Sequence, residues 1–129
     1  MKKDLSLEEK IGQMFMFGVN KNNIDGILEL IKNNKIGGVR LYKQNYTSYE
    51  EMLSLIKRIR EANASNKTPL LVAVDQEGGR VNRMPKELKN LRSITYVSDL
   101  NKPSLIKKYS EIISKELSEC NINMNFAPV

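Results

Sequence analysis

The sequence contains no histidine and no tryptophan, and Cys120 is its single cysteine among 129 residues. Without histidine, these residues cannot form a Ser-His-Asp triad. A lone cysteine cannot form an internal disulfide, and the shortage of nitrogen and sulfur ligands means that no metal site is expected. Cys120 falls on a predicted helix that packs against a sheet, which favours a small buried apolar side chain over a reactive thiol.

Long apolar runs are also missing, so no segment has the length that a membrane span needs. Residues 1–6 hold two lysines but continue into acidic residues, unlike the apolar core of a signal peptide. We therefore expect a cytoplasmic protein without a membrane partner.

Charge of one sign is not concentrated anywhere. The chain has 21 Lys and Arg against 15 Asp and Glu, a formal net charge of +6, but the basic residues are scattered among acids. No basic stripe carries the aromatic residues that stack on bases, so nucleic acid is not an expected partner. The G-x-G-x-x-G and G-K-[ST] phosphate loops are absent, and no nucleotide cofactor is expected either.

What the sequence does contain is a regular alternation of helical and strand patterns. The spacing of Ser6 to Glu9 and of Ser48 to Glu51 predicts a capping box at two helix starts. Five consecutive apolar residues at 70–74 predict a strand buried on both faces of a parallel sheet. The predicted helices cover residues 7–14, 24–32, 49–62 and 103–121, and the predicted strands cover residues 15–19, 39–42, 70–74 and 124–129.

Strands that alternate with helices predict right-handed crossovers and an all-parallel α/β sheet. Both a doubly wound sheet and a (β/α)₈ TIM barrel have this pattern. A barrel takes about 250 residues, and the last predicted strand has no helix after it to cover it, which favours part of a barrel. We expect the first four β/α units, so that residues 1–129 form the N-terminal half of a barrel domain, truncated at its C-terminus.

Residues 76–100 show no clear periodicity and exceed the usual connection of about two to six residues. This stretch begins at the C-terminal end of a predicted strand, where α/β folds bind ligands. Asp75 is able to accept hydrogen bonds from vicinal sugar hydroxyls, and Arg83 is able to donate to others. Gly78 and Gly79 would let the main chain turn sharply and approach a ligand closely. A structural ion pair between Asp75 and Arg83 is the alternative, and Glu77 is expected to be a structural hydrogen-bonding partner.

Four segments resemble, in order, the N-terminal half of glycoside hydrolase family 3, and in particular its bacterial β-N-acetylhexosaminidase branch. They are Leu7–Val19, Ile36–Val39, Val72–Arg83 and Asn123–Val129. The most specific part is Asp-Gln-Glu-Gly-Gly-Arg-Val-Asn-Arg, from Asp75 to Arg83. The resemblance implies a (β/α)₈ barrel and a retaining hydrolysis that removes terminal N-acetylglucosamine from peptidoglycan fragments through a covalent glycosyl-enzyme. It assigns Asp75 and Arg83 to the hydroxyls of that sugar.

The resemblance also places the nucleophilic aspartate and the Asp-His acid/base dyad beyond Val129. It therefore assigns no catalytic residue to this chain, which we expect to be inactive alone. Residues 40–45 depart from the family pattern of a more apolar strand end followed by Arg-Asn, so no ligand contact is assigned there. Asn125 stands where Asp is frequent and keeps a hydrogen-bonding side chain.

Two other functions remain open at this point. One is a β-glucosidase of the same family, although the Asp75 to Arg83 segment favours the hexosaminidase branch. The other is a non-catalytic carbohydrate-binding module in which two half-barrels close on one another. Half a barrel has two unpaired sheet edges, which favour self-association.

Overall fold

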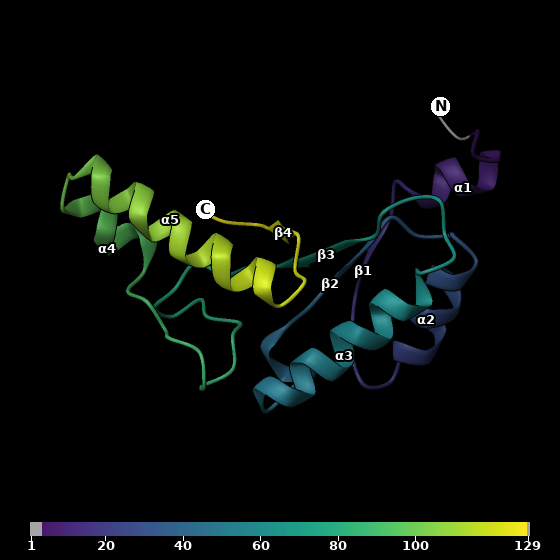
Figure 1. Cartoon of the computed structure of the whole chain (residues 1–129), viewed down its shortest axis with the longest axis horizontal. Coiled ribbons are helices and arrows are strands. Elements are labelled where there is room, and N and C mark those ends of the chain that lie inside the picture. The colour runs from purple at the N-terminus through teal and green to yellow at the C-terminus, as the bar shows by residue number, and fades with distance from the viewer. Residues whose placement is uncertain (1–3, 129) are drawn as a thin grey trace.

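The structure, a computed structural model, describes residues 4–128 and confirms the alternation of strands and helices (Figure 1). The elements are α1 Leu7–Gly12, β1 Met16–Gly18, α2 Ile24–Lys32, β2 Gly38–Arg40, the 3₁₀ helix η1 Lys43–Asn45, α3 Tyr49–Ala62, β3 Leu71–Val74, α4 Ile94–Asp99, α5 Pro103–Glu119 and β4 Met124–Asn125. The strands form one sheet in which each neighbouring pair is parallel.

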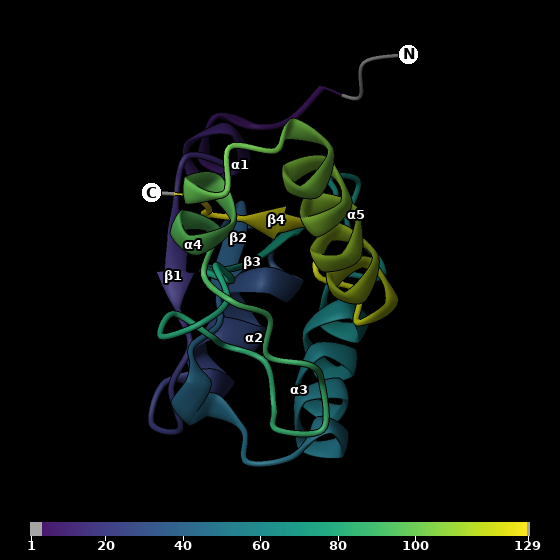
Figure 2. The ribbon, with the colours of Figure 1, turned by 90° about the vertical axis from the view of Figure 1, so that its left-hand side faces the viewer.

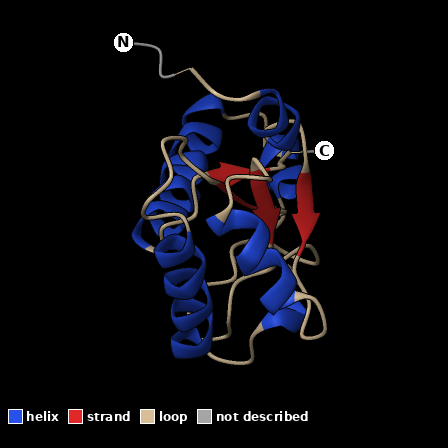
Figure 3. Cartoon of the chain, turned by 90° about the vertical axis from the view of Figure 1, so that its right-hand side faces the viewer, coloured by secondary structure: helices blue, strands red, loops and turns tan. Residues whose placement is uncertain are grey.

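Strand order decides between the two architectures that the sequence left open. The four strands follow the order of the chain, β1-β2-β3-β4. A doubly wound sheet reverses its strand order at a switch point and carries helices on both faces. Figure 2 shows β1 at the margin of the sheet, and Figure 3 shows the helices grouped around the short strands. Successive strands in chain order are the arrangement of a (β/α)₈ barrel, which confirms the predicted fold class.

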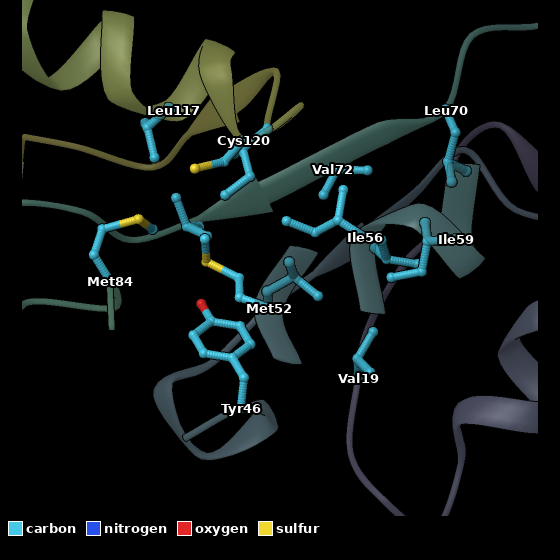
Figure 4. Packing of buried hydrophobic residues seen from close by; sticks show 14 of the residues in the cluster. Val19, Tyr46, Met52, Ile56, Ile59, Leu70, Val72, Met84, Leu117 and Cys120 are labelled. Carbon is cyan, nitrogen blue, oxygen red and sulfur yellow. The ribbon is translucent and has the colours of Figure 1, made fainter. Parts of the chain in front are cut away.

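The two faces of the sheet differ because successive side chains of a strand point to opposite sides. Val39 of β2 and Val72 and Val74 of β3 are fully buried and belong to the core. The helices α2, α3 and α5 add Ile27, Ile31, Met52, Ile56, Ile59, Tyr109, Ile113 and Leu117 to that core. Figure 4 shows Val72 between the side chains of α3 and those of Leu117 and Cys120. Apolar periodicity in the helices thus produces one continuous core.

The second face carries Gly38 and Arg40 of β2, which pair with Leu71 and Ala73 of β3. Leu71 remains 42% exposed, so the prediction that this strand is buried on both faces is wrong at its first residue. The physical reason is that α2, α3 and α5 pack on the face of Val72 and Val74.

The last strand is shorter than predicted. β4 ends at Asn125, whereas the sequence predicted a strand over residues 124–129, of which Val129 lies outside the described residues. Side-chain amides contribute to its pairing: Asn123 Oδ1 accepts from Val72 N at 2.7 Å, and Asn123 Nδ2 donates to Leu70 O at 3.0 Å. These bonds hold β4 against β3 without a long main-chain ladder.

The helix starts were predicted with mixed success. Ser6 and Glu9 form the expected capping box, with Glu9 N donating to Ser6 Oγ at 3.2 Å and Ser6 N donating to Glu9 Oε2 at 2.8 Å. At α3 only half of the box is present. Glu51 N donates to Ser48 Oγ, but the Glu51 carboxylate accepts from Thr47 N at 2.7 Å instead of from Ser48 N. The capping box predicted at Ser48 is therefore wrong in its second bond.

Residues 76–100 are not entirely irregular, because α4 lies within them. Ser93 Oγ accepts from Tyr96 N at 3.3 Å and begins this helix, which buries Val97. The helix is too short for an apolar stripe to reveal it. Cys120 is 1% exposed, as predicted, and burial raises the pKa of its thiol. None of the helices in residues 4–128 combines the length and the apolar character that a membrane crossing requires.

Gly37 and Gly26 provide a matched test of the packing before β2. A Cβ at Gly37 would lie 2.4 Å from Gln13 O, whereas a Cβ at Gly26 on α2 would meet nothing within 4 Å. We expect Gly37→Ala to lower the free energy of unfolding by about 1–3 kcal/mol through overpacking. Gly26→Ala should raise it by about 0.5–1 kcal/mol, because alanine is the better helix former. Urea unfolding of both variants measures the difference, and equal stabilities would contradict this packing.

Candidate functional site

The parallel sheet brings the C-terminal ends of its strands to one edge. Arg40 ends β2, Asp75 follows β3 and Phe126 follows β4. Arg40 is in register with Ala73, and Ala73 is in register with Met124. Because alternate residues share a face, Arg40, Asp75 and Phe126 lie on the same side of the sheet, opposite the helical core. This edge is where α/β barrels bind their ligands.

The Asp75 carboxylate lies between two guanidinium groups. Its Oδ2 atom is bonded to Arg40 Nη2 and lies 3.5 Å from Arg83 Nη2. The structure thus brings the two predicted site residues together, in the ion pair that the sequence also allowed. Arg40, to which the sequence comparison assigned no ligand contact, is the closer partner. The register of β2 against β3 places Arg40 beside Asp75, and the sequence does not specify that register.

Three buried polar atoms in this cluster have no hydrogen-bond partner among residues 4–128. They are Asp75 Oδ1, Arg40 Nε and Arg83 Nε. Most buried polar atoms in proteins are hydrogen-bonded, so an unpaired acceptor beside two unpaired donors indicates a missing partner. Hydroxyl groups both donate and accept, and they match this set of atoms.

Aromatic rings flank the Arg40 guanidinium. Its Cζ atom lies 5.2 Å from the centre of the Tyr42 ring and 5.6 Å from that of Phe126. Cations are attracted to the faces of such rings at these distances. The hydrogen bond to Asp75 raises the pKa of Arg40, so its guanidinium is charged at every accessible pH. Aromatic side chains from the segments that follow β2 and β4 thus flank one cation.

The main chain of Arg83 is held on both sides. Arg83 N donates to Gln76 Oε1 at 2.7 Å, and Tyr46 Oη donates to Arg83 O at 3.0 Å. Gln76 is 2% exposed, and its Nε2 atom donates to Asn82 Oδ1 at 2.8 Å. Figure 4 shows the Tyr46 hydroxyl pointing toward the segment that carries Met84. Gln76 and Tyr46 therefore position Arg83, and no motif in the sequence indicated either role.

Asn125 connects the site to β4. Its Oδ1 atom accepts from Gln76 N at 2.8 Å, and its Nδ2 atom donates to Gln76 O at 3.0 Å. An ionised aspartate would accept the first bond but cannot donate the second. The expectation that Asn125 keeps a hydrogen-bonding side chain is confirmed.

Gly78 and Gly79 form the expected sharp turn, with φ of +78° and +59°. However, the surface that they approach belongs to the chain itself. A Cβ at Gly78 would lie 2.3 Å from Tyr109 Oη, and a Cβ at Gly79 would lie 3.0 Å from Ser93 N. Packing against the segment before α4 and against α5 already requires these glycines, and the close approach of a ligand to them stays a prediction.

Glu77 has the structural role that the sequence predicted, through its main chain. Glu77 N donates to Val81 O at 3.0 Å, and Glu77 O accepts from Ile94 N at 3.2 Å. Tyr109 Oη lies 2.6 Å from the same Glu77 carbonyl oxygen. The turn is thereby bonded to α4 and α5.

The charges of the cluster do not suit a metal ion. Two guanidinium groups surround one carboxylate, so a cation would be repelled. Within residues 4–128, His, Cys, Asp and Glu side chains do not gather in groups of three that would hold a metal ion. The cluster suits a polar ligand rich in hydroxyls.

Comparison with known proteins identifies the family. Residues 6–129 match the family described as "Glycosyl hydrolase family 3 N terminal domain". The chain belongs to this family. The family 3 chain is 33% identical over 102 residues to a β-hexosaminidase of Vibrio cholerae serotype O1, covering 78% of the chain and 30% of the relative. It is 35% identical over 102 residues to a β-hexosaminidase of Photobacterium profundum, with the same two coverages, 78% and 30%.

Solved structures of the family show the same fold. A glycoside hydrolase family 3 β-N-acetylglucosaminidase from Paenibacillus sp. superposes with a TM-score of 0.87 at 31% identity, covering 97% of this chain and 24% of that one. A β-N-acetylhexosaminidase from Beutenbergia cavernae gives a TM-score of 0.80 at 28% identity, with coverages of 97% and 38%. The family 3 chain thus spans about 30% of the length of the curated relatives that it matches.

Tyr109 and Tyr96 offer a matched test of the glycine turn. Tyr109 Oη lies 2.6 Å from Glu77 O and 2.8 Å from Arg92 O, whereas Tyr96 is 47% exposed. We expect Tyr109→Phe to lower the free energy of unfolding by about 0.5–1.5 kcal/mol, because it removes the hydroxyl group that donates a hydrogen bond to the Glu77 or the Arg92 carbonyl oxygen. Tyr96→Phe should change it by less than about 0.5 kcal/mol.

Urea unfolding gives both values, and amide hydrogen exchange shows where protection is lost. Faster exchange in residues 77–93 of Tyr109→Phe is the expected pattern. A variant with unchanged stability and exchange would show that Tyr109 does not hold the turn.

Proposed function

We propose that this chain carries the part of a retaining β-N-acetylhexosaminidase that binds the terminal N-acetylglucosamine, through Asp75 and Arg83. The observation that carries the proposal is the buried, unpaired Asp75 Oδ1 atom beside the unpaired Arg83 Nε atom at the C-terminal edge of the sheet. The similarity of this chain to proteins named β-hexosaminidase and β-N-acetylglucosaminidase supports the choice of N-acetylglucosamine as the sugar.

In this proposal Asp75 accepts hydrogen bonds from the sugar hydroxyls and Arg83 donates to them. Retaining hydrolysis needs a nucleophilic carboxylate and a separate acid/base group. Both arginines pair with the Asp75 carboxylate. A carboxylate paired in this way is suited to binding and not to nucleophilic attack. We therefore propose that the 129-residue chain does not hydrolyse glycosides alone.

The finer part of the proposal concerns substrate and location. N-acetylglucosamine attached to a peptidoglycan fragment is the proposed ligand, in cell-wall turnover. We propose a cytoplasmic location, on the basis of the buried, unpaired thiol of Cys120.

Asp75→Asn tests the assignment of the sugar site, with Asp25→Asn as the control. Asp25 is an exposed acid that pairs with Arg58 on α3, at 3.2 Å. We expect Asp75→Asn to weaken binding of N-acetylglucosamine by more than about tenfold, because a charge-assisted hydrogen bond is lost. Asp25→Asn should bind as the unaltered chain does. Sugar titration followed by NMR shift changes measures both affinities, and equal affinities would refute the role of Asp75.

Hydrolysis of a chromogenic β-N-acetylglucosaminide tests the activity. The assay compares this chain with the same chain extended by the next ~200 codons of its gene, the length that a full barrel requires. Activity in the extended chain alone is the expected result. Activity in the 129-residue chain would show that the proposed division of binding and catalysis is wrong.

We further propose that the chain self-associates through the outer edges of β1 and β4, each of which has one neighbour in the described sheet. Met14 and Phe15 just before β1 are 82% and 52% exposed, and Phe17 within it is 42% exposed. Unpaired strand edges with exposed apolar residues promote pairing with another chain. Sedimentation velocity at increasing concentration should show a growing share of dimer or larger species. A single monomeric species at every concentration would contradict this.

A further inference from the structure

Arg40 is the more exposed member of its ion pair with Asp75. The side chain of Asp75 is 9% exposed, whereas that of Arg40 is 39% exposed. Within residues 4–128, the side-chain hydrogen bond of Arg40 goes to Asp75 alone. The second oxygen, Asp75 Oδ1, is buried as well. A hydroxyl group that approaches this edge of the sheet therefore meets a guanidinium group before it meets the carboxylate.

We infer that Arg40 determines the affinity of the site as a displaceable cover: its guanidinium occupies Asp75 Oδ2 in the ligand-free chain, and a sugar hydroxyl bonds to this oxygen only after Arg40 has moved away. The inference rests on the proposed function, because it takes Asp75 as the sugar-binding carboxylate. It adds a residue from β2 to the determinants of that binding.

The geometry indicates that Arg40 moves and Arg83 remains. Gln76 and Tyr46 fix the main chain of Arg83 on both sides, and the Arg83 side chain is the less exposed of the two, at 28%. When Arg40 leaves, Arg83 still neutralises Asp75, so no unpaired buried charge is created.

The released guanidinium also retains favourable surroundings. It is already partly in water, and the rings of Tyr42 and Phe126 lie within 5.2 Å and 5.6 Å of its Cζ atom. A short rotation of the side chain keeps contact with a ring face while it uncovers the carboxylate. Exchange of Arg40 for a hydroxyl group therefore replaces one partner of Asp75 by another without removing all of them.

A cover of this kind lowers the apparent affinity, because only the fraction of chains with Arg40 displaced is able to bind. Removing the guanidinium should therefore strengthen sugar binding, whereas removing a residue that contacts the sugar would weaken it. Added salt screens the ion pair and favours the uncovered state. The unaltered chain should then bind more tightly as the salt concentration rises.

Carboxyl labelling tests the cover without any sugar. A water-soluble carbodiimide and an amine modify accessible carboxylates, and mass spectrometry of the peptides measures the labelling of Asp75. Arg40→Met keeps the length and packing of the side chain and removes its charge. Arg40→Lys keeps the charge but replaces the planar guanidinium group by an ammonium group. Arg58→Met is the control, because Arg58 also pairs with an aspartate, Asp25, at 3.2 Å.

We expect labelling of Asp75 to rise about tenfold in Arg40→Met, the change that corresponds to loss of a ~1.4 kcal/mol contact. Arg40→Lys should give an intermediate rise, and Arg58→Met should give none. Circular dichroism establishes that each variant is folded. If Arg40→Met does not fold, Arg40→Lys decides the question by the same measurement.

Titration with N-acetylglucosamine provides the second readout. Arg40→Met should bind the sugar about tenfold more tightly than the unaltered chain. The affinity of this variant should not increase with salt concentration, because the ion pair that salt screens is gone. Bound sugar should also protect Asp75 of this variant from labelling.

Unchanged labelling in the folded Arg40 variants would overturn the cover. Weaker sugar binding in Arg40→Met would overturn it too, and would make Arg40 a direct contact of the sugar. Increased labelling without protection by sugar has a different meaning: the cover stands, and the proposed sugar-binding role of Asp75 fails. The two proposals therefore fail by distinguishable results.

Discussion

Burial of one negative charge, on Asp75, organises the C-terminal edge of this sheet. A buried carboxylate is costly unless it is paired and hydrogen-bonded. Its two cations come from separate parts of the chain, Arg40 from the end of β2 and Arg83 from the turn after β3. Each cation has its own support, aromatic rings for Arg40 and two main-chain hydrogen bonds for Arg83. The position of the carboxylate thus depends on the parallel register, and the turn depends on Gln76.

Local patterns predicted most of the elements, because their causes lie within a few residues. Apolar spacing located α2, α3 and α5, and the capping box at Ser6 begins α1 as expected. The errors occur where contacts between distant residues decide. β4 is held in part by side-chain amides of Asn123 and Asn125, which bond to β3 and to Gln76, and such bonds leave no periodic signal. The helix α4 is too short to show an apolar stripe.

The candidate site shows the same division between local and distant causes. Asp75 and Arg83 were predicted because one ends a strand and both lie in a segment that resembles a known family. Arg40 was missed as a partner of Asp75, since only the pairing of β2 with β3 brings the two residues together. Gly78 shows the reverse: its conformation was predicted correctly, but its neighbour, Tyr109, lies on a helix further along the chain. A sequence motif therefore identified the chemistry, and packing determined which contacts the residues make.

The bonds of Gln76 have a mechanical consequence. Its main chain is bonded to Asn125 of β4, while its side chain is bonded to Asn82 and to the main chain of Arg83. One buried residue thus connects the last strand to a guanidinium group of the candidate site. A shift of β4 by even a fraction of a hydrogen-bond length would be transmitted to Arg83, without any movement of a domain. The pairing of β4 with β3 and the position of the Arg83 main chain are therefore coupled through Gln76.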